Sequence, residues 1–349
     1  MGAHTAALAR LAVAVSVIAA ASLAWLQPWN RPPVPPAEIK SVQVLSATTA
    51  VVLTQARPDP PDSYLGYETG DGGRSWRRFR VAPQAEVHFV DAGHGFASTE
   101  FELFATADGG RTWQSRPLPP DQHFAPAAWF LDADRGWYLN LDVLSGTGLP
   151  RDLYRTVDGG RSWQHLWHGT SGLAQTPVFA DPEHGWMAAD FSVLATSDGG
   201  VTWTPLKAPL IADRAGVQLA AGALIEYSSE LNAAGDVVWR AAASTDGGAS
   251  WGPAQQSPGS GIVDVAFADA SHWRAITRSH VWRTDDGGAN WTPVSTRLPT
   301  GDWLNSTRYL DAERGWALAG SPPAAFPTRL LRTADGGGSW SEVALPSLG

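Results

Sequence analysis

The sequence contains no cysteine, no excess of basic residues and no cluster of residues with metal-ligand spacing. Without cysteine it has neither a disulfide framework nor a thiolate metal or redox site. The formal net charge of -9 argues against a nucleic-acid-binding surface. The nine histidines are scattered, and no two are spaced as metal ligands on one element. We therefore expect no required metal and no cofactor.

What the chain does contain is a motif that recurs seven times. A hydroxyl residue and one free position precede Asp-Gly-Gly, and a further free position, a Ser, Thr or Asn, and a tryptophan follow it. The aspartate can accept bonds from its own downstream amides, the glycines supply the positive φ of a tight turn, and the tryptophan covers the turn. The motif aspartates and tryptophans are Asp71, Asp108, Asp158, Asp198, Asp246, Asp286 and Asp335, and Trp76, Trp113, Trp163, Trp203, Trp251, Trp291 and Trp340. We assign both sets a structural role, with no part in catalysis or metal binding.

A second pattern precedes most of these motifs. An apolar stretch, a turn that begins with aspartate and a second apolar stretch occupy residues 88–96, 129–137, 178–186, 266–274 and 308–316. One further strand leads into each Asp-Gly-Gly motif and another leaves it, so each repeat holds the four strands of a propeller blade. Repeats at 42–54 and 217–227 lack the clean turn but hold the same place. The predicted fold class is all-β, a seven-bladed β-propeller of four-stranded blades, preceded by an N-terminal hydrophobic anchor helix.

The ends of the repeat array indicate how the ring closes. The first repeat begins with its own first strand, and the last ends after its fourth, so no strand is expected to be shared between them. Closure would then depend on blade-to-blade packing. Because Trp340 lies in the last repeat, we expect its truncation to loosen the closure.

The Asp-Gly-Gly motif closely resembles the Asp-box, or BNR, repeat of β-propellers such as sialidases, sortilin-type receptors and photosystem II assembly factors. The phrase FxDxxxGW followed by TxDGGxxW is similar to the pattern of the photosystem II stability and assembly factors, and five repeats match it. This resemblance implies an exported scaffold that binds a protein. A sialidase would also carry an Arg-Ile-Pro phrase before its first box, whereas the nearest string here, Phe79-Arg80-Val81, follows the first box.

The N-terminus carries the evidence on localisation. Residues 11–26 read LAVAVSVIAAASLAWL, without a charge, and are followed by a proline-rich stretch. We predict a signal anchor or transmembrane segment at 1–30, a linker at 31–37 and the propeller at 38–349. The expected location is the cell membrane, with a single span and an extracytoplasmic propeller. The alternative is a secreted protein, because Ser22-Leu23-Ala24 offers a cleavage site for a signal peptide.

The spacing of the boxes indicates which face could bind a partner. Connections between second and third strands are long in the odd repeats, at 55–63, 141–151, 228–236 and 320–328. Because strands of a meander alternate in direction, these connections and those between blades should share one face, which we call the loop face. The boxes should lie on the opposite face, the box face.

Two sets of polar residues are candidates for binding or catalysis. Basic residues hold one shared turn position and could bind an acidic partner, or could simply keep an exposed turn soluble: His94, Arg135, His184, His272 and Arg314. Carboxylates on or beside the long connections could serve a glycosidase, although nothing pairs them: Asp59, Asp62, Asp142, Asp152, Glu230 and Asp236.

Taken together, these features favour a membrane-anchored extracytoplasmic scaffold that binds a protein partner. No complete catalytic constellation is evident, so we do not expect an enzyme. The alternative is an exported, sialidase-like glycoside hydrolase with a carbohydrate ligand, and a structural wall protein is a third interpretation.

Overall fold

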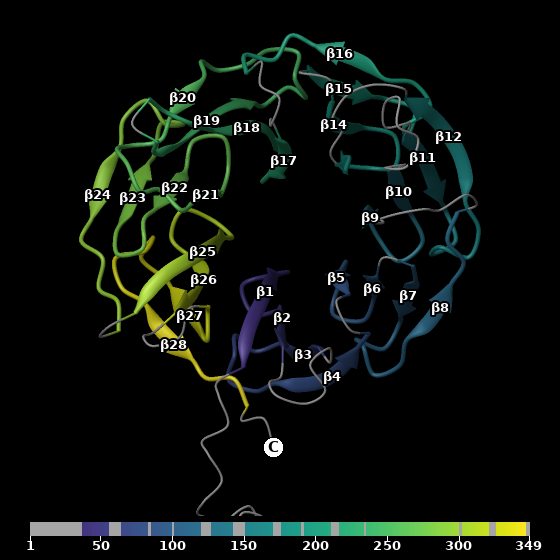
Figure 1. The fold of residues 1–349 in the computed structure, drawn as a ribbon, viewed down its shortest axis with the longest axis horizontal. Helices are drawn as coiled ribbons and strands as arrows, with labels where there is room; N and C mark the ends of the chain where they lie inside the picture. Colours follow the sequence, from purple (N-terminus) through teal and green to yellow (C-terminus); the bar gives the residue numbers. More distant parts are fainter. Residues whose placement is uncertain are drawn as a thin grey trace, which may run out of the picture. The chain divides into compact units, whose positions relative to one another are not determined.

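The computed structural model describes residues 37–55, 64–82, 85–99, 101–119, 127–141, 151–169, 176–189, 192–210, 216–233, 235–299, 302–320 and 326–346. In these ranges every regular element is a β-strand, and the strands form seven four-stranded sheets arranged in a ring (Figure 1). The predicted all-β, seven-bladed propeller is therefore confirmed. The predicted anchor helix at 1–30 and the predicted linker at 31–37, apart from Ala37, lie outside the described residues.

Each sheet is one blade built from four consecutive strands. Blades one and two consist of β1 (Glu38–Val44), β2 (Ala50–Gln55), β3 (Tyr64–Thr69) and β4 (Arg77–Val81), then β5 (Glu86–Phe89), β6 (Gly95–Ser98), β7 (Leu103–Thr106) and β8 (Gln114–Arg116). Blades three and four consist of β9 (Ala127–Phe130), β10 (Gly136–Leu141), β11 (Arg151–Thr156) and β12 (Gln164–Gly169), then β13 (Val178–Phe179), β14 (Gly185–Ala189), β15 (Ser192–Thr196) and β16 (Thr204–Leu206). Blades five to seven consist of β17 (Gly216–Ala220), β18 (Ala223–Leu231), β19 (Val237–Ser244) and β20 (Gln255–Gln256), then β21 (Asp264–Phe267), β22 (Trp273–Ile276), β23 (Val281–Thr284) and β24 (Thr292–Val294), then β25 (Trp303–Tyr309), β26 (Gly315–Gly320), β27 (Arg329–Thr333) and β28 (Ser341–Val343).

Neighbouring strands of a blade are antiparallel, with the first strand beside the central opening and the fourth at the rim (Figure 1). The first-to-second turns and the boxes therefore lie on one face. The ends of the strands that lead into the second-to-third connections and into the links between blades point to the other face, as the alternation of strand direction predicts.

The second sequence pattern is explained by an aromatic ring that packs over a glycine. Phe130 on β9 pairs with Gly136 on β10, and a Cβ atom at Gly136 would come 2.4 Å from the Phe130 ring. The same pairing joins Phe89 to Gly95, Phe179 to Gly185 and Tyr309 to Gly315. The glycine is therefore required for space, since any side chain there would displace a core ring.

Each box forms a turn held by its own side chains. In blade four, Asp198 Oδ1 accepts bonds from the Thr196 hydroxyl (2.8 Å) and the Thr202 amide (2.9 Å), and Oδ2 accepts one from the Thr202 hydroxyl (2.6 Å). The hydroxyl-to-aspartate bond recurs in all seven boxes. Both box glycines have positive φ, between 67° and 100° across the seven boxes. The structural role predicted for the box aspartates matches this geometry.

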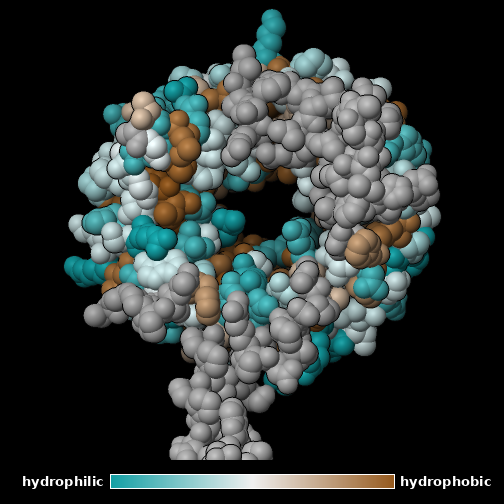
Figure 2. Space-filling view, viewed as in Figure 1, coloured by the Kyte–Doolittle hydropathy of each residue, from teal (hydrophilic) through white to brown (hydrophobic). Residues whose placement is uncertain are grey.

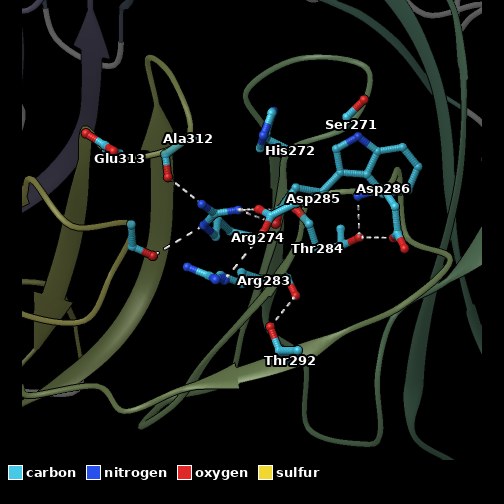
Figure 3. A network of polar contacts seen from close by, with 12 residues as sticks. Ser271, His272, Arg274, Arg283, Thr284, Asp285, Asp286, Thr292, Ala312 and Glu313 are labelled. Carbon is cyan, nitrogen blue, oxygen red and sulfur yellow. Dashed lines mark hydrogen bonds and ion pairs between the residues drawn. The ribbon is translucent and has the colours of Figure 1, made fainter.

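The boxes also hold neighbouring blades together. In six boxes the carbonyl of the first glycine accepts a hydrogen bond from a side chain of the preceding blade; the donor–acceptor pairs are Arg332–Gly72, Arg77–Gly109, Arg116–Gly159, Trp137–Gly199, Trp186–Gly247 and Arg274–Gly336. Figure 3 shows Arg274, which is 2% exposed, extending from β22 to the carbonyl of Ala312 in blade seven. An arginine or a tryptophan can fill this role because each offers an N–H at the end of a large side chain.

The box tryptophans pack across blade boundaries. Each ring packs against an apolar cluster formed by its own blade and the preceding one. Trp113, Trp163, Trp203, Trp251, Trp291 and Trp340 lie at the boundaries from blades one and two to blades six and seven in order, and Trp76 lies at the boundary of blades seven and one. Trp340 is 6% exposed, whereas the other six are half-buried. The indole N–H groups of Trp76, Trp163 and Trp291 donate to the carbonyls of Ala344, Pro117 and Gln256.

The ring closes between blades one and seven without a shared strand, as the sequence predicts. Ile39 of β1 donates its backbone N–H to the carbonyl of Pro327 (2.8 Å), and Val42 packs with Trp316 of β26. The expectation that Trp340 closes the ring is wrong, because its ring packs in the cluster between blades six and seven and not in the one between blades seven and one. Trp76 contacts blade seven and is the box tryptophan of the closure. The tryptophan of a box packs at the boundary with the preceding blade, so the box of blade one, and not that of blade seven, supplies the tryptophan of the closure.

Candidate functional site

The five basic residues that the sequence singled out lie at equivalent turns of the box face. Each pairs with the aspartate that opens its own turn, at 2.7 to 3.0 Å; the pairs are His94–Asp91, Arg135–Asp132, His184–Asp181, His272–Asp269 and Arg314–Asp311. The pKa of Asp181 is lowered by hydrogen bonds from the His184 backbone amide and side chain. The five basic residues therefore contact aspartates of their own turns, and the binding of an acidic partner by this set stays a prediction.

These turns also bind the boxes. The amide of the first box glycine donates to a carbonyl of the adjacent turn, as in Gly199 to Glu183 (2.9 Å) and Gly336 to Glu313 (2.8 Å). Turn and box thus form one rigid hydrogen-bonded unit on the box face. Many of the hydrogen-bonding groups on the box face therefore bond to one another within the protein.

Polar side chains on the first strands, which lie beside the central opening, connect one blade to the next. The Gln43 amide on β1 accepts from the Phe89 backbone N–H (2.8 Å) and donates to its carbonyl (2.7 Å). Asp264 on β21 accepts the Thr307 backbone N–H of β25 (2.9 Å). Burial raises the pKa of Asp264, against hydrogen bonding from Thr307 and the charge of Arg308. These channel residues therefore have structural partners.

On the loop face, exposed large apolar side chains lie close together in sequence and pairing at blades five and six. The hairpin of β18 and β19 ends in the cross-strand pair Leu231 and Val237, which are 71% and 38% exposed. Val263, just before β21, is 40% exposed. Figure 2 shows apolar residues gathered where blades five and six meet, beside the central opening. An exposed apolar area of this kind is typical of an interaction surface.

Aromatic and arginine side chains lie at the same end of blades five and six and at the start of blade seven. Arg278 lies over the Trp303 ring, with 5.1 Å between its guanidinium carbon and the ring centroid. Trp303 in turn covers Gly320, where a Cβ would come 2.1 Å from the ring. Tyr227 packs beside Trp239, with ring centroids 6.3 Å apart. Trp, Tyr and Arg are the residues that most often dominate binding energy at protein interfaces.

We call this set the loop-face cluster: Tyr227, Leu231, Val237, Trp239, Val263, Arg278 and Trp303. The sequence does not indicate this set of residues, although it predicts a long connection at 228–236 on the same face. Its members come from three blades, and the only signal in the sequence was that Trp239 and Trp303 belong to neither recurring pattern.

The carboxylates considered for glycoside hydrolysis do not form a described pair. Asp152 pairs with His165 (2.7 Å), and Glu230 pairs with Arg240 (3.1 Å). Asp236 lies in the β18–β19 hairpin, where its backbone N–H donates to Asn232 (2.9 Å). Asp59, Asp62 and Asp142 lie outside the described residues. Within the described ranges, no group of three or more His, Asp or Glu residues is arranged to hold a metal ion.

One buried carboxyl group stands apart from both faces. Glu226 on β18 is fully buried, and its Oε2 accepts the Leu210 backbone N–H (3.0 Å). Its Oε1 has no partner among the described residues. Burial raises the pKa of Glu226 to about 7, which affects stability as discussed below.

The part of the chain that the structure describes contains no helix long and apolar enough to cross a bilayer. The stretch at 11–26 on which the predicted membrane segment depends lies outside that part.

Comparison with known proteins supports the resemblance to assembly factors. No protein-family model matches the chain. A curated relative, the photosystem II assembly lipoprotein Ycf48 of Synechococcus sp. (strain CC9902), is 33% identical over 85 residues, which cover 24% of each chain. The match thus spans about a quarter of that relative's length.

Solved structures share the fold over most of the chain. YCF48 bound to D1 peptide superposes with a TM-score of 0.60 at 17% identity, covering 86% of this chain and 95% of that one. An ancestral GH74 enzyme superposes with a TM-score of 0.54 at 15% identity, covering 89% of this chain and 47% of the enzyme. The chain therefore resembles photosystem II assembly factors in part of its sequence and in its fold. It shares the propeller fold with glycoside hydrolases as well.

Proposed function

We propose that this protein is a membrane-anchored, extracytoplasmic scaffold that binds a protein partner through its loop face. The observation that carries the proposal is the loop-face cluster, which combines exposed apolar residues with tryptophan, tyrosine and arginine side chains at one end of blades five to seven. The box face offers a contrast, because the basic residues of its turns are paired with their own aspartates.

Two further observations support the proposal. The solved YCF48 structure carries a D1 peptide, so a propeller of this type can hold a polypeptide segment. The uncharged stretch at 11–26 is consistent with export and anchoring. Membrane attachment would be tested by alkaline extraction of membranes together with the intact mass of the recovered protein. Recovery of a soluble chain lacking the N-terminal stretch would favour the secreted alternative.

The binding face can be tested by site-specific photo-crosslinking in cells. A benzophenone amino acid at Leu231, which is 71% exposed, should give a discrete crosslinked species with a partner. The matched control is Val157 in the box of blade three, which is 64% exposed on the opposite face and should give none. A crosslink from Val157 but not from Leu231 would contradict the proposed face.

The rival function is an exported glycoside hydrolase, for which the shared GH74 fold is the main argument. Fold alone does not carry that activity, because hydrolysis needs two carboxyl groups held at a defined separation. A screen of aryl glycosides separates the two functions. Turnover that is abolished by changing a single carboxylate would support the enzyme and overturn the scaffold.

A further inference from the structure

A cavity of about 310 Å³ opens between the inner strands of blades two and three. Its polar and aromatic lining residues are Glu86 and His88 of β5, Phe96 and Ser98 of β6, Trp129 of β9 and Thr176 just before β13. Glu86 and Ser98 form the pair at the loop-face end of their hairpin, so the cavity lies on the loop-face side. It is separate from the loop-face cluster, which belongs to blades five to seven.

The hydrogen-bond network around His88 keeps this imidazole neutral. The Gln43 side-chain nitrogen donates to the Phe89 carbonyl and also lies 3.2 Å from His88 Nδ1, so Nδ1 must accept. His88 Nε2 lies 3.1 Å from the Phe130 carbonyl and must therefore donate. Burial lowers the pKa of His88, which agrees with this tautomer. The imidazole thus lines the cavity without adding positive charge.

The charge of the cavity is negative. Glu86 is exposed at its edge, and no Lys or Arg is among the lining residues. Among the described residues no cation lies within ion-pair distance of the Glu86 carboxylate. An unpaired carboxylate beside a partly enclosed space attracts a cation more strongly than one in open water.

Trp129 supplies an aromatic wall. Its ring contacts Trp137 and Phe179, with centroids 5.8 and 6.1 Å away, so its position is fixed by the core. No hydrogen-bond partner of its indole N–H occurs among the described residues. A tryptophan ring is the aromatic surface that attracts cations best, and it also packs well against methylene groups.

We propose that this cavity binds a basic side chain, lysine or arginine, of a partner polypeptide. The aliphatic stem would pack against Trp129 and Ala128, and the charged end would pair with Glu86. The volume is at the lower limit for ligand sites, which suits one side chain better than a larger molecule. This inference deepens the proposed function, because it names the chemistry of one partner residue on the loop face.

The test uses small probes and the full-length protein. Nα-acetyl-lysine methylamide is compared with Nα-acetyl-norleucine methylamide, which has a similar stem but no charge, by saturation-transfer NMR. We expect transfer to the lysine side chain and little to norleucine, and weaker binding at high salt. Glu86→Gln should weaken lysine binding at least tenfold. Glu102→Gln changes an exposed loop-face carboxylate outside the cavity and should leave binding unchanged.

Three results would overturn the inference: equal binding of norleucine, lysine binding that is unaffected by Glu86→Gln, or binding of methyl β-D-glucoside with no binding of lysine. The last would assign the cavity to a carbohydrate. Because Glu86 is exposed, its substitution should leave the melting temperature unchanged, so lost binding would not reflect unfolding. Crosslinking at Leu231 that persists in Glu86→Gln, with no lysine binding, would refute the cavity and leave the proposed function intact. Lysine binding without any crosslink at Leu231 would support the cavity and contradict the proposed binding face.

Discussion

Truncation of Trp76 should loosen the closure of the ring. This residue is the box tryptophan at the boundary of blades seven and one, in the same apolar cluster as Val343 and Leu345, and its indole N–H donates to the Ala344 carbonyl (3.0 Å). Removing a fully buried tryptophan costs about 3 to 5 kcal/mol, and Trp76 is only half-buried. With about 1 kcal/mol for the hydrogen bond, we expect Trp76→Ala to lower the free energy of unfolding by about 2 to 3 kcal/mol.

The location of the damage distinguishes Trp76 from the other box tryptophans. No strand is shared between blades one and seven, so this boundary can open without breaking a sheet. Hydrogen exchange in Trp76→Ala should therefore accelerate first in β1 and β26, which face each other across the boundary. Trp340→Ala should have the larger effect on stability and lower the free energy of unfolding by about 3 to 5 kcal/mol, because Trp340 is 6% exposed. Urea midpoints measure this difference. Its effect on exchange should centre on blades six and seven.

The opposite pattern would refute this reasoning. If Trp340→Ala exposed β1 while Trp76→Ala left it protected, the assignment of each box tryptophan to the preceding blade would be wrong. Trp203→Ala serves as the control, because its ring packs between blades three and four, far from the closure in the chain order.

Three further predictions concern individual side chains. Hydrogen bonds from the Thr202 side chain and amide lower the pKa of Asp198 to about 2, below its unfolded value of about 3.9. The stabilisation that Asp198 provides is therefore complete above about pH 4 and is lost as the pH falls toward 2. A pH series of urea midpoints should show the difference in stability between wild type and Asp198→Asn narrowing over that range. For Glu226 the pH dependence has the opposite sign, because its folded pKa of about 7 exceeds the unfolded value, so stability should fall as the pH rises from about 4.5 to 7. In thermal melts, the free energy of unfolding of Glu226→Gln relative to wild type should increase by up to about 3 kcal/mol between pH 4 and pH 8. A difference that stays constant with pH would contradict the assignment. Arg274→Ala should lower the free energy of unfolding by about 2 to 4 kcal/mol, because it leaves the carbonyls of Ala312 and Gly336 without this donor. Arg274→Trp should recover part of the loss, because Trp137 makes the equivalent bond in blade three. Equal urea midpoints for the two variants would argue against the cross-blade bond.

The sequence by itself determined the number of blades, their four-strand composition and the structure of each box. These features depend on contacts within a few residues. The Asp198 carboxylate bonds groups at positions 196, 201 and 202, and two glycines with positive φ follow it, so the turn is specified wherever the motif occurs. Alternation of strand direction likewise determined which connections share a face.

Only the tertiary structure decided which blades each side chain joins and where a partner could bind. Trp76 and Ala344 are 268 positions apart in the chain, so nothing local in the sequence indicated that they meet. The loop-face cluster draws on three blades, and the cavity beside Trp129 draws on residues of blades two and three and on Thr176 before blade four. The physical reason is that a propeller buries its apolar surface between blades. The surfaces that bind and the contacts that close the ring therefore arise from neighbours in space, which the motif spacing does not identify.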